Sequence, residues 1–304
     1  IVSFIGFQND TIHVSSKNQQ LDIVLRDGVE LNEVNIVTRK LGTMKLRSSV
    51  MNEDMISSAE LSRAACCNLG ESFVTNPSVD VSYSDAATGA KQIKLLGLSG
   101  TYVQMLTENI PNYRGAAAPY GLGYVPGPWM QSIQVSKGTS SVKNGYEAIT
   151  GQINVEFKKP QLPEADWVSA NLFASTTNRY EANADATLKL SKRWSTSLLA
   201  HYENETKAHD GNDDGFVDIP QVEQYNVWNR WAYMGDHYVF QAGIKALSET
   251  RTSGQANHGG TMHSGDLYKV GIDTERYEFF TKNAYIFNKE KNTNLALILS
   301  ASWH

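Results

Sequence analysis

Long segments in the second half of the chain alternate between apolar and polar positions, a period that predicts β-strands. In residues 181–190, Ala and Leu occupy every second position, and Glu, Asn, Asp, Thr and Lys occupy the positions between them. Residues 194–203 and 237–246 repeat the alternation, with Leu199 as an exception on the polar side. Apolar faces that end in Trp or Tyr are what the wall of a membrane barrel requires, although a soluble β-sandwich also alternates.

About seven strands of this kind are expected between Trp167 and His304. The last one, Leu295–Trp303, is not followed by a strand that could close a barrel. An open sheet leaves unpaired backbone groups at its edges, so these residues are predicted to form only part of a barrel.

The first half of the chain mixes helical and extended patterns. Residues 54–69 have a helical period and predict one helix. The adjacent Cys66 and Cys67 point apart on such a helix, which favours two small buried residues over a metal pair or a disulfide. Short strands are expected at residues 92–98, 102–106 and 132–136, and also within residues 1–30.

Composition excludes several classes of protein. No apolar run approaches the roughly 18 residues that a membrane helix needs, and 41% hydrophobic with 19% charged residues indicates a folded chain. The net charge of -5 offers no phosphate-neutralising surface, so nucleic-acid binding is not expected. No zinc-hydrolase motif, catalytic triad order or phosphate-binding glycine loop occurs, so the protein is not expected to be an enzyme.

The segment Met130–Pro160 carries the most specific motif. It combines an apolar strand, a Lys137-Gly138 turn, a Gly145-Tyr146 pair and a second strand that contains Ile153-Asn154-Val155. This order resembles the end of the plug domain of TonB-dependent outer-membrane receptors, with the Tyr-Gly order of the family inverted.

A second stretch, Gly97–Pro111, is also similar to that family. Gly97 and Gly100 keep the family's turn. Leu96 stands where the family usually has arginine, and Glu108-Asn109 stands where it has Asp-Gly.

The resemblance implies an α+β plug domain followed by antiparallel transmembrane β-barrel strands. Such barrels close with about 22 strands, so the barrel would be incomplete and the chain a piece of a longer precursor. The implied domains are the end of a carboxypeptidase-regulatory-like β-sandwich (1–30), a TonB-box-like linker (31–43), the plug (44–160) and the first strands of the barrel (161–304).

The linker carries the residues implied to couple the receptor to its energy source. In the family, a short segment at this place adds as a strand to a TonB-type energy-coupling protein. An ordinary strand or linker is the alternative. The residues implied for the coupling are Glu33, Val34, Asn35, Ile36 and Val37.

The segment from Asn109 to Trp129 is rich in Gly, Pro and Tyr and has no periodicity, which predicts a long functional loop. In the family the corresponding loop faces the outer vestibule and touches the substrate. A loop packed on the barrel wall is the alternative. The implied substrate-binding residues are Tyr102, Tyr113, Arg114, Tyr120, Tyr124 and Trp129.

An acidic loop spaces oxygen ligands as calcium loops do, with a glycine at the sixth position. Gln221 stands at the twelfth position, so an EF-hand proper is not expected, and a solvated acidic turn is the alternative. The predicted Ca²⁺ ligands are Asp210, Asn212, Asp214 and Asp218.

A second polar loop holds His258 and His263, with Met262 beside the latter. Imidazole and thioether groups suit copper, zinc or haem iron, so both histidines are candidate substrate-binding residues. Exposure to solvent without a ligand is the alternative.

The predicted function is active import of a scarce solute across the outer membrane. The solute would be a metal or a metal chelate, such as a siderophore, haem, cobalamin or copper. A glycan importer is the first alternative and a calcium-dependent surface adhesin the second. The predicted partners are the coupling protein, outer-membrane lipid, the solute and a surface lipoprotein.

Overall fold

The computed structural model describes residues 43–45, 52–63, 67–74, 76–140, 144–162, 165, 167–256, 267–288, 291 and 293–304. Residues 41–304 group as one compact unit. The predicted sandwich remnant, the coupling residues Glu33 to Val37, Cys66, His258 and His263 lie outside the described residues.

A six-stranded sheet forms the centre of the plug, by which we mean the described residues between 43 and 160. Its order is β1-β2-β8-β9-β6-β7, and only the β6–β9 pair is parallel. Gly151 begins β9 next to β8, where a Cβ would lie 2.1 Å from the Ser136 carbonyl oxygen, so no larger residue fits. The strands are β1 (Thr43–Lys45), β2 (Asn52–Ser57), β6 (Val103–Thr107), β7 (Ile110–Pro111), β8 (Met130–Lys137) and β9 (Gly151–Phe157).

The helix predicted over residues 54–69 is wrong in its extent. Residues Asn52–Ser57 form β2, which pairs with β8, and helix α1 covers only Ser58–Arg63. The Ser57 hydroxyl accepts a hydrogen bond from the Glu60 backbone N–H at 3.4 Å and so caps the start of α1. Pairing with a strand far along the chain therefore overrides the local helical period.

Cys67 follows α1 and is buried, as predicted. Burial raises the pKa of its thiol. The side chain accordingly serves the packing of the plug.

A three-stranded sheet of β3 (Val79–Asp85), β4 (Ala90–Leu95) and β5 (Leu98–Ser99) completes the plug. The strand predicted at 92–98 is therefore interrupted. Leu96 and Gly97 have φ of 53° and 83° and form the turn between β4 and β5, because two positive φ angles match the twist of a tight hairpin. Among the described residues, four short 3-10 helices join the strands: η1 (Glu71–Phe73), η2 (Gly100–Tyr102), η3 (Gly115–Ala117) and η4 (Gly127–Trp129).

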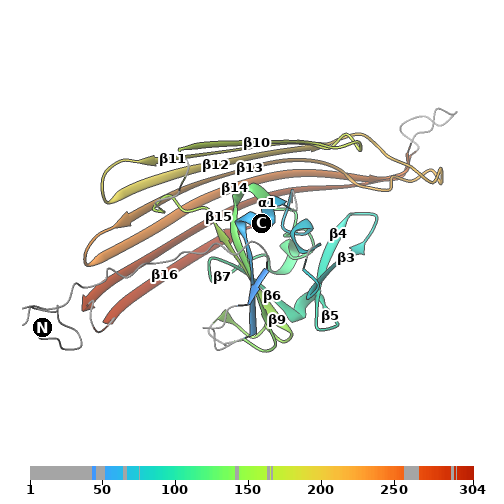
Figure 1. Cartoon of the computed structure of the whole chain (residues 1–304). Coiled ribbons are helices and arrows are strands. Elements are labelled where there is room, and N and C mark those ends of the chain that lie inside the picture. Colours follow the sequence, from blue (N-terminus) through green and yellow to red (C-terminus); the bar gives the residue numbers. More distant parts are fainter. Residues whose placement is uncertain are drawn as a thin grey trace, which may run out of the picture. The chain divides into compact units, whose positions relative to one another are not determined.

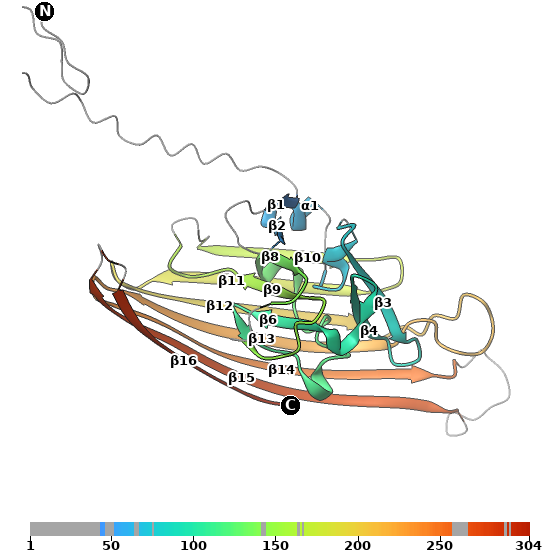
Figure 2. The same ribbon diagram turned by 90° about the horizontal axis from the view of Figure 1, so that it is seen from below.

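The second half of the chain forms a seven-stranded antiparallel sheet in sequence order, which we call the wall. The number of wall strands among the described residues agrees with the sequence prediction. The plug lies against one face of the wall in both views (Figure 1, Figure 2). The strands are β10 (Val168–Ala174), β11 (Tyr180–Lys189), β12 (Trp194–Glu205), β13 (Gln221–Met234), β14 (Tyr238–Gly254), β15 (Lys269–Asn288) and β16 (Thr293–Trp303).

The two faces of the wall have opposite polarity. The predicted polar positions, such as Glu181 and Ser197, face the plug and are buried. The predicted apolar positions face away, and Ile244 keeps 65% of its surface exposed. Leu199, the exception in the alternation, is buried in the apolar core of the plug.

Aromatic residues mark two levels on the outward face. Trp194 and Tyr202 of β12 stand eight positions apart, and so do Tyr277 and Tyr285 of β15. Eight residues span roughly 26 Å along a strand, which at a tilt of about 40° gives a band of about 20 Å, close to the apolar band of an outer-membrane barrel. Within the described residues, no helix has the length and apolar character needed to cross a membrane.

Candidate solute pocket and plug contacts

The connections between the wall strands distinguish its two ends. Residues 190–193 and 235–237 make short turns at one end, where the chain also passes from β15 to β16, and the longer connections from β12 to β13 and from β14 to β15 leave from the other end. Outer-membrane barrels have short periplasmic turns and longer extracellular loops. We therefore call the end with the long connections the outer end.

A pocket opens between the plug and the wall near the outer end. Both parts contribute charged and aromatic side chains to it, so neither forms the pocket alone. The lining includes Glu71, Tyr83, Lys91 and Tyr120 from the plug, and Phe173, Arg179, Glu203, Glu205, Glu249 and Arg251 from the wall and its turns.

Arg179 connects the plug to the wall inside this pocket. Its guanidinium lies 2.7 Å from a carboxylate oxygen of Glu71 in the plug. It also lies 2.6 Å from Glu181 and 3.0 Å from Glu203 in the wall. Three carboxylates compensate the burial of this cation, so Arg179 is an anchor and not a free ligand for a solute.

Lys91 differs from the arginines of the pocket. Its ammonium lies 5.4 Å from the centre of the Tyr83 ring, and it makes no ion pair within the described part of the chain. Arg251, by contrast, lies 3.0 Å from Glu249 and 5.3 Å from the Tyr120 ring. Burial lowers the pKa of Lys91. Lys91 is therefore the cation in this pocket best placed to receive an anionic group.

A second set of contacts joins the wall to the β6–β7 turn of the plug. Glu108 and Asn109 form this turn with φ of 51° and 64°, a conformation that Asn tolerates but that strains Glu by about 1–3 kcal/mol. The buried Glu108 carboxylate accepts a hydrogen bond of 2.5 Å from Arg230. Lys282 lies 3.6 Å from the other carboxylate oxygen and donates to the Glu108 carbonyl at 2.7 Å. Ion pairs and hydrogen bonds from Arg230 and Lys282 therefore hold this turn against the wall.

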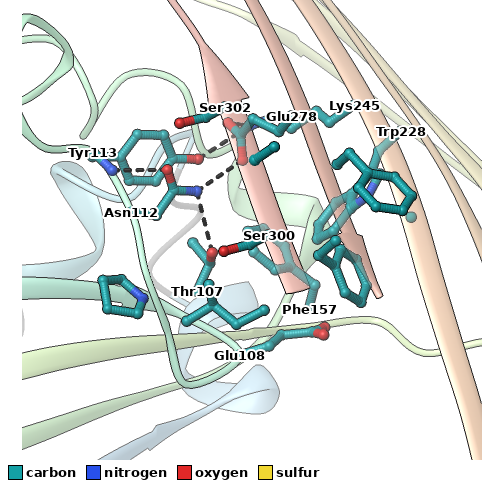
Figure 3. A pocket seen from close by; sticks show the side chains of 16 residues that line it. Thr107, Glu108, Asn112, Tyr113, Phe157, Trp228, Lys245, Glu278, Ser300 and Ser302 are labelled. Atoms are coloured by element: carbon teal, nitrogen blue, oxygen red, sulfur yellow. Dashed lines mark hydrogen bonds and ion pairs between the residues drawn. The ribbon is translucent and has the colours of Figure 1, made fainter. Parts of the chain in front are cut away.

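The wall also contacts the next plug residues, Asn112 and Tyr113 (Figure 3). The Asn112 amide donates to Glu278 at 2.8 Å and accepts from Arg276 at 2.6 Å. Lys245 donates to the Tyr113 hydroxyl at 3.1 Å, and Tyr113 also has a positive φ, 52°. A cavity adjoins these contacts and continues to Ser300 and Ser302 of β16.

An aromatic contact lies beside the charged ones. Trp228 of β13 points to the plug, where its ring centre lies 4.5 Å from that of Phe157 and 6.3 Å from that of Trp129. Gly243 makes room for this packing, because a Cβ there would lie 2.5 Å from the Phe280 ring and 2.7 Å from the Trp228 nitrogen. The plug is thus attached to the wall by one apolar and two charged regions.

Three residues with an implied substrate role keep accessible side chains. Tyr120 lines the outer pocket. Tyr102 is 43% exposed, and Arg114 is exposed while it pairs with Glu147 at 2.7 Å. Tyr120 alone of these three lies in the outer pocket.

The other three, Tyr113, Tyr124 and Trp129, are buried, with at most 3% of their surface exposed. Burial raises the pKa of Tyr124 to about 12. These side chains pack between plug and wall, and Tyr113 also lines the cavity of Figure 3, so a substrate role for them stays a prediction. Their aromatic bulk fills the interface, and that explains their abundance in this segment.

The acidic loop before β13 is closed by its own backbone. The Asp210 carboxylate accepts from the Gly215 N–H at 2.7 Å, and Asp218 accepts from the Gly211 N–H at 2.6 Å. Among the described residues, no group of three or more His, Cys, Asp or Glu side chains is arranged to hold a metal ion. The calcium site at Asp210, Asn212, Asp214 and Asp218 stays a prediction.

The charged contacts of the outer pocket and of the β6–β7 turn have no motif in the sequence. Arg179, Lys91 and Arg251 of the pocket, and Glu108 and Arg230 of the turn contact, were not singled out for a role. The signal for these residues in the sequence is a charged side chain at a polar position of the strand pattern. That face of the strand points inward, so the charge becomes buried. Their partners lie far apart in sequence, since Glu108 and Arg230 are 122 positions apart, so the pairing itself carries no local signature.

Comparison with known proteins agrees with this arrangement. Residues 45–152 match the family model of the TonB-dependent receptor plug domain. The vitamin B12 transporter BtuB of Vibrio vulnificus (strain CMCP6) is 24% identical over 185 residues, which are 61% of this chain and 30% of that protein.

Solved receptor structures share the fold. The closed form of the ferric-catecholate import receptor Fiu from E. coli K12 has a TM-score of 0.66 at 16% identity, over 87% of this chain and 40% of that one. The alcaligin outer-membrane receptor FauA from Bordetella pertussis has a TM-score of 0.62 at 12% identity, over 86% and 41%. The chain thus spans less than half the length of each relative.

Proposed function

We propose, on the premise that this chain is the plug domain and part of the barrel of a TonB-dependent outer-membrane receptor, that the protein imports a metal chelate across the outer membrane. The relatives are named as transporters and receptors, not enzymes. Their named ligands are vitamin B12, ferric catecholates and alcaligin. These names support a chelated metal as the class of solute.

The arrangement of plug and wall supports transport most directly. The plug packs against the polar face of the wall, while the apolar face is turned outward. A solute in the outer pocket meets the plug, so passage requires the plug to move. Such movement requires work, which a coupling protein would supply by pulling on Glu33 to Val37 as an added strand.

The outer pocket would receive the solute. Lys91 offers a positive charge, and Tyr83 and Tyr120 offer ring faces. Carboxylate, phenolate or phosphate oxygens of a chelate would pair with Lys91. Substitution of Lys91 by Met should weaken chelate binding about tenfold, the loss of one charge-assisted hydrogen bond. Lys94, which lies on the same strand and does not line the pocket, provides the matched control as Lys94→Met.

The first experiment is to purify the full-length precursor product from outer membranes and to analyse its bound metals and small molecules, with calcium removed and restored. A co-purifying metal chelate, and uptake of that chelate that stops in cells without the coupling protein, are the expected results. A bound oligosaccharide would contradict the proposal and favour the glycan importer. Sugar binding that is lost when calcium is removed and returns when calcium is restored would favour the adhesin.

A further inference from the structure

The wall residues that contact the segment 108–113 carry more positive than negative charges. Four of them are cationic: Arg230, Lys245, Arg276 and Lys282. Within the described residues, Glu278 is the one carboxylate of the wall that contacts this segment. The plug adds Glu108, which lies between Arg230 and Lys282, and backbone and amide oxygens. The wall cations here exceed the wall carboxylate by three charges, and Glu108 of the plug offsets one of these, beside Arg230 and Lys282.

The neighbouring part of the wall has the opposite sign. On β11 and β12 the inward positions hold Glu181, Asp185, Glu203 and Glu205. There the plug supplies a cation, since Lys158 lies 2.6 Å from Asp185. The inner face therefore has an acidic zone on β11–β12 and, on β13–β15, a zone in which cations outnumber the carboxylates Glu249 and Glu278, which we call the basic zone. The basic zone borders the cavity of Figure 3.

The segment 108–113 is also the part of the plug with the most backbone strain. Glu108, Asn109 and Tyr113 have positive φ, which makes three of the six described non-glycine residues of this kind. Strained residues persist where surrounding contacts hold them, and they gather at functional sites. Here the contacts are the ion pairs and hydrogen bonds to the basic zone. The segment would relax once those contacts are broken.

We propose that withdrawal of the segment 108–113 uncovers the basic zone as the path of a negatively charged solute. Removal of Glu108 leaves Arg230 and Lys282 without their carboxylate partner, next to Lys245, which lines the cavity. Cationic side chains along a pore favour anions. The solute class is therefore a metal chelate with exposed anionic oxygens. This inference rests on the proposed function of import, and it adds the route and the sign of the solute's charge.

The test is the ion selectivity of the full-length receptor in a planar lipid bilayer. Glu108→Lys places a cation between Arg230 and Lys282 and should drive the segment off the wall. A steady current that favours chloride over potassium in a KCl gradient is expected, whereas the unchanged receptor should stay closed. Adding Lys245→Gln and Lys282→Gln should lower the chloride preference about threefold.

Lys189→Gln provides the control, because Lys189 is exposed at the end of β11; added to Glu108→Lys, it should leave the selectivity unchanged. Heat-modifiable migration shows that each variant is folded. If Glu108→Lys does not fold, Glu108→Gln should give a smaller current of the same selectivity. A folded variant with no current, with cation preference, or with selectivity insensitive to Lys245 and Lys282 would overturn the proposal. Chloride and potassium carry the current, so the outcome is independent of whether the protein imports a metal chelate.

Discussion

The plug and the wall bury opposite kinds of side chain. Ile133 and Ile153 of the plug are completely buried, as in a protein that folds in water. In the wall, Asn226 and Glu181 are buried, while Ile244 is 65% exposed. This inversion is stable only if the outward face of the wall contacts lipid. The plug therefore buries apolar side chains and the wall exposes them. The change from one pattern to the other falls between β9 and β10.

The largest expected effect is a difference in stability loss between two tryptophan substitutions, one at Trp129 in the plug and one at Trp231 on the outward face of the wall. Trp129→Ala should reduce the free energy of unfolding of the full-length receptor by about 3–5 kcal/mol, because Trp129 is fully buried between plug and wall. Trp231→Ala on the outward face should cost clearly less, since Trp231 is 40% exposed. Urea titration in detergent, followed by loss of heat-modifiable migration, measures both. Equal losses would show that Trp129 is not part of a packed core.

The second effect concerns the polar contacts across the boundary between plug and wall. Arg230→Met leaves the buried Glu108 carboxylate without its arginine, and should cost about 3–5 kcal/mol in the same titration. The double variant Arg230→Met with Glu108→Gln should recover most of the loss, because it removes the unpaired charge as well. No recovery in the double variant would contradict the pairing.

An exposed ion pair provides the control for that charge pair. Arg193 and Asp236 lie 2.8 Å apart at the short-turn end, with more than half of each side chain exposed. Arg193→Met should cost at most about 1 kcal/mol. A cost similar to that of Arg230→Met would mean that burial does not determine the strength of these pairs.

The wall was predictable from the sequence because its signal is local. A period of two places polar residues on one face of each strand, and Leu199, the exception, is explained by the apolar core of the plug that it joins. The predicted helix was wrong because β2 is held by pairing with β8, which no short window of sequence contains.

The candidate sites were less predictable for the same reason. Tyr120 lines the outer pocket and its substrate role stays a prediction, whereas Tyr124 and Trp129 are buried. Composition shows that a loop is aromatic but not which rings it buries. The contact of Glu108 with Arg230 depends on how the plug sits against the wall, and each charge alone looks like an ordinary polar position.

The third effect tests the lipid side of the comparison directly. Ile244→Lys places a charge on the outward face of β14 between the two aromatic levels, where Ile244 is 65% exposed. In a protein surrounded by water such a change would be nearly neutral, but in a bilayer it should cost about 2–4 kcal/mol. Urea titration of the receptor folded in lipid vesicles measures this cost, with Ile244→Leu as the control that keeps the side chain apolar. A negligible cost for Ile244→Lys would place this face in water, and the wall would then be half of a soluble sandwich whose polar face happens to be covered by the plug.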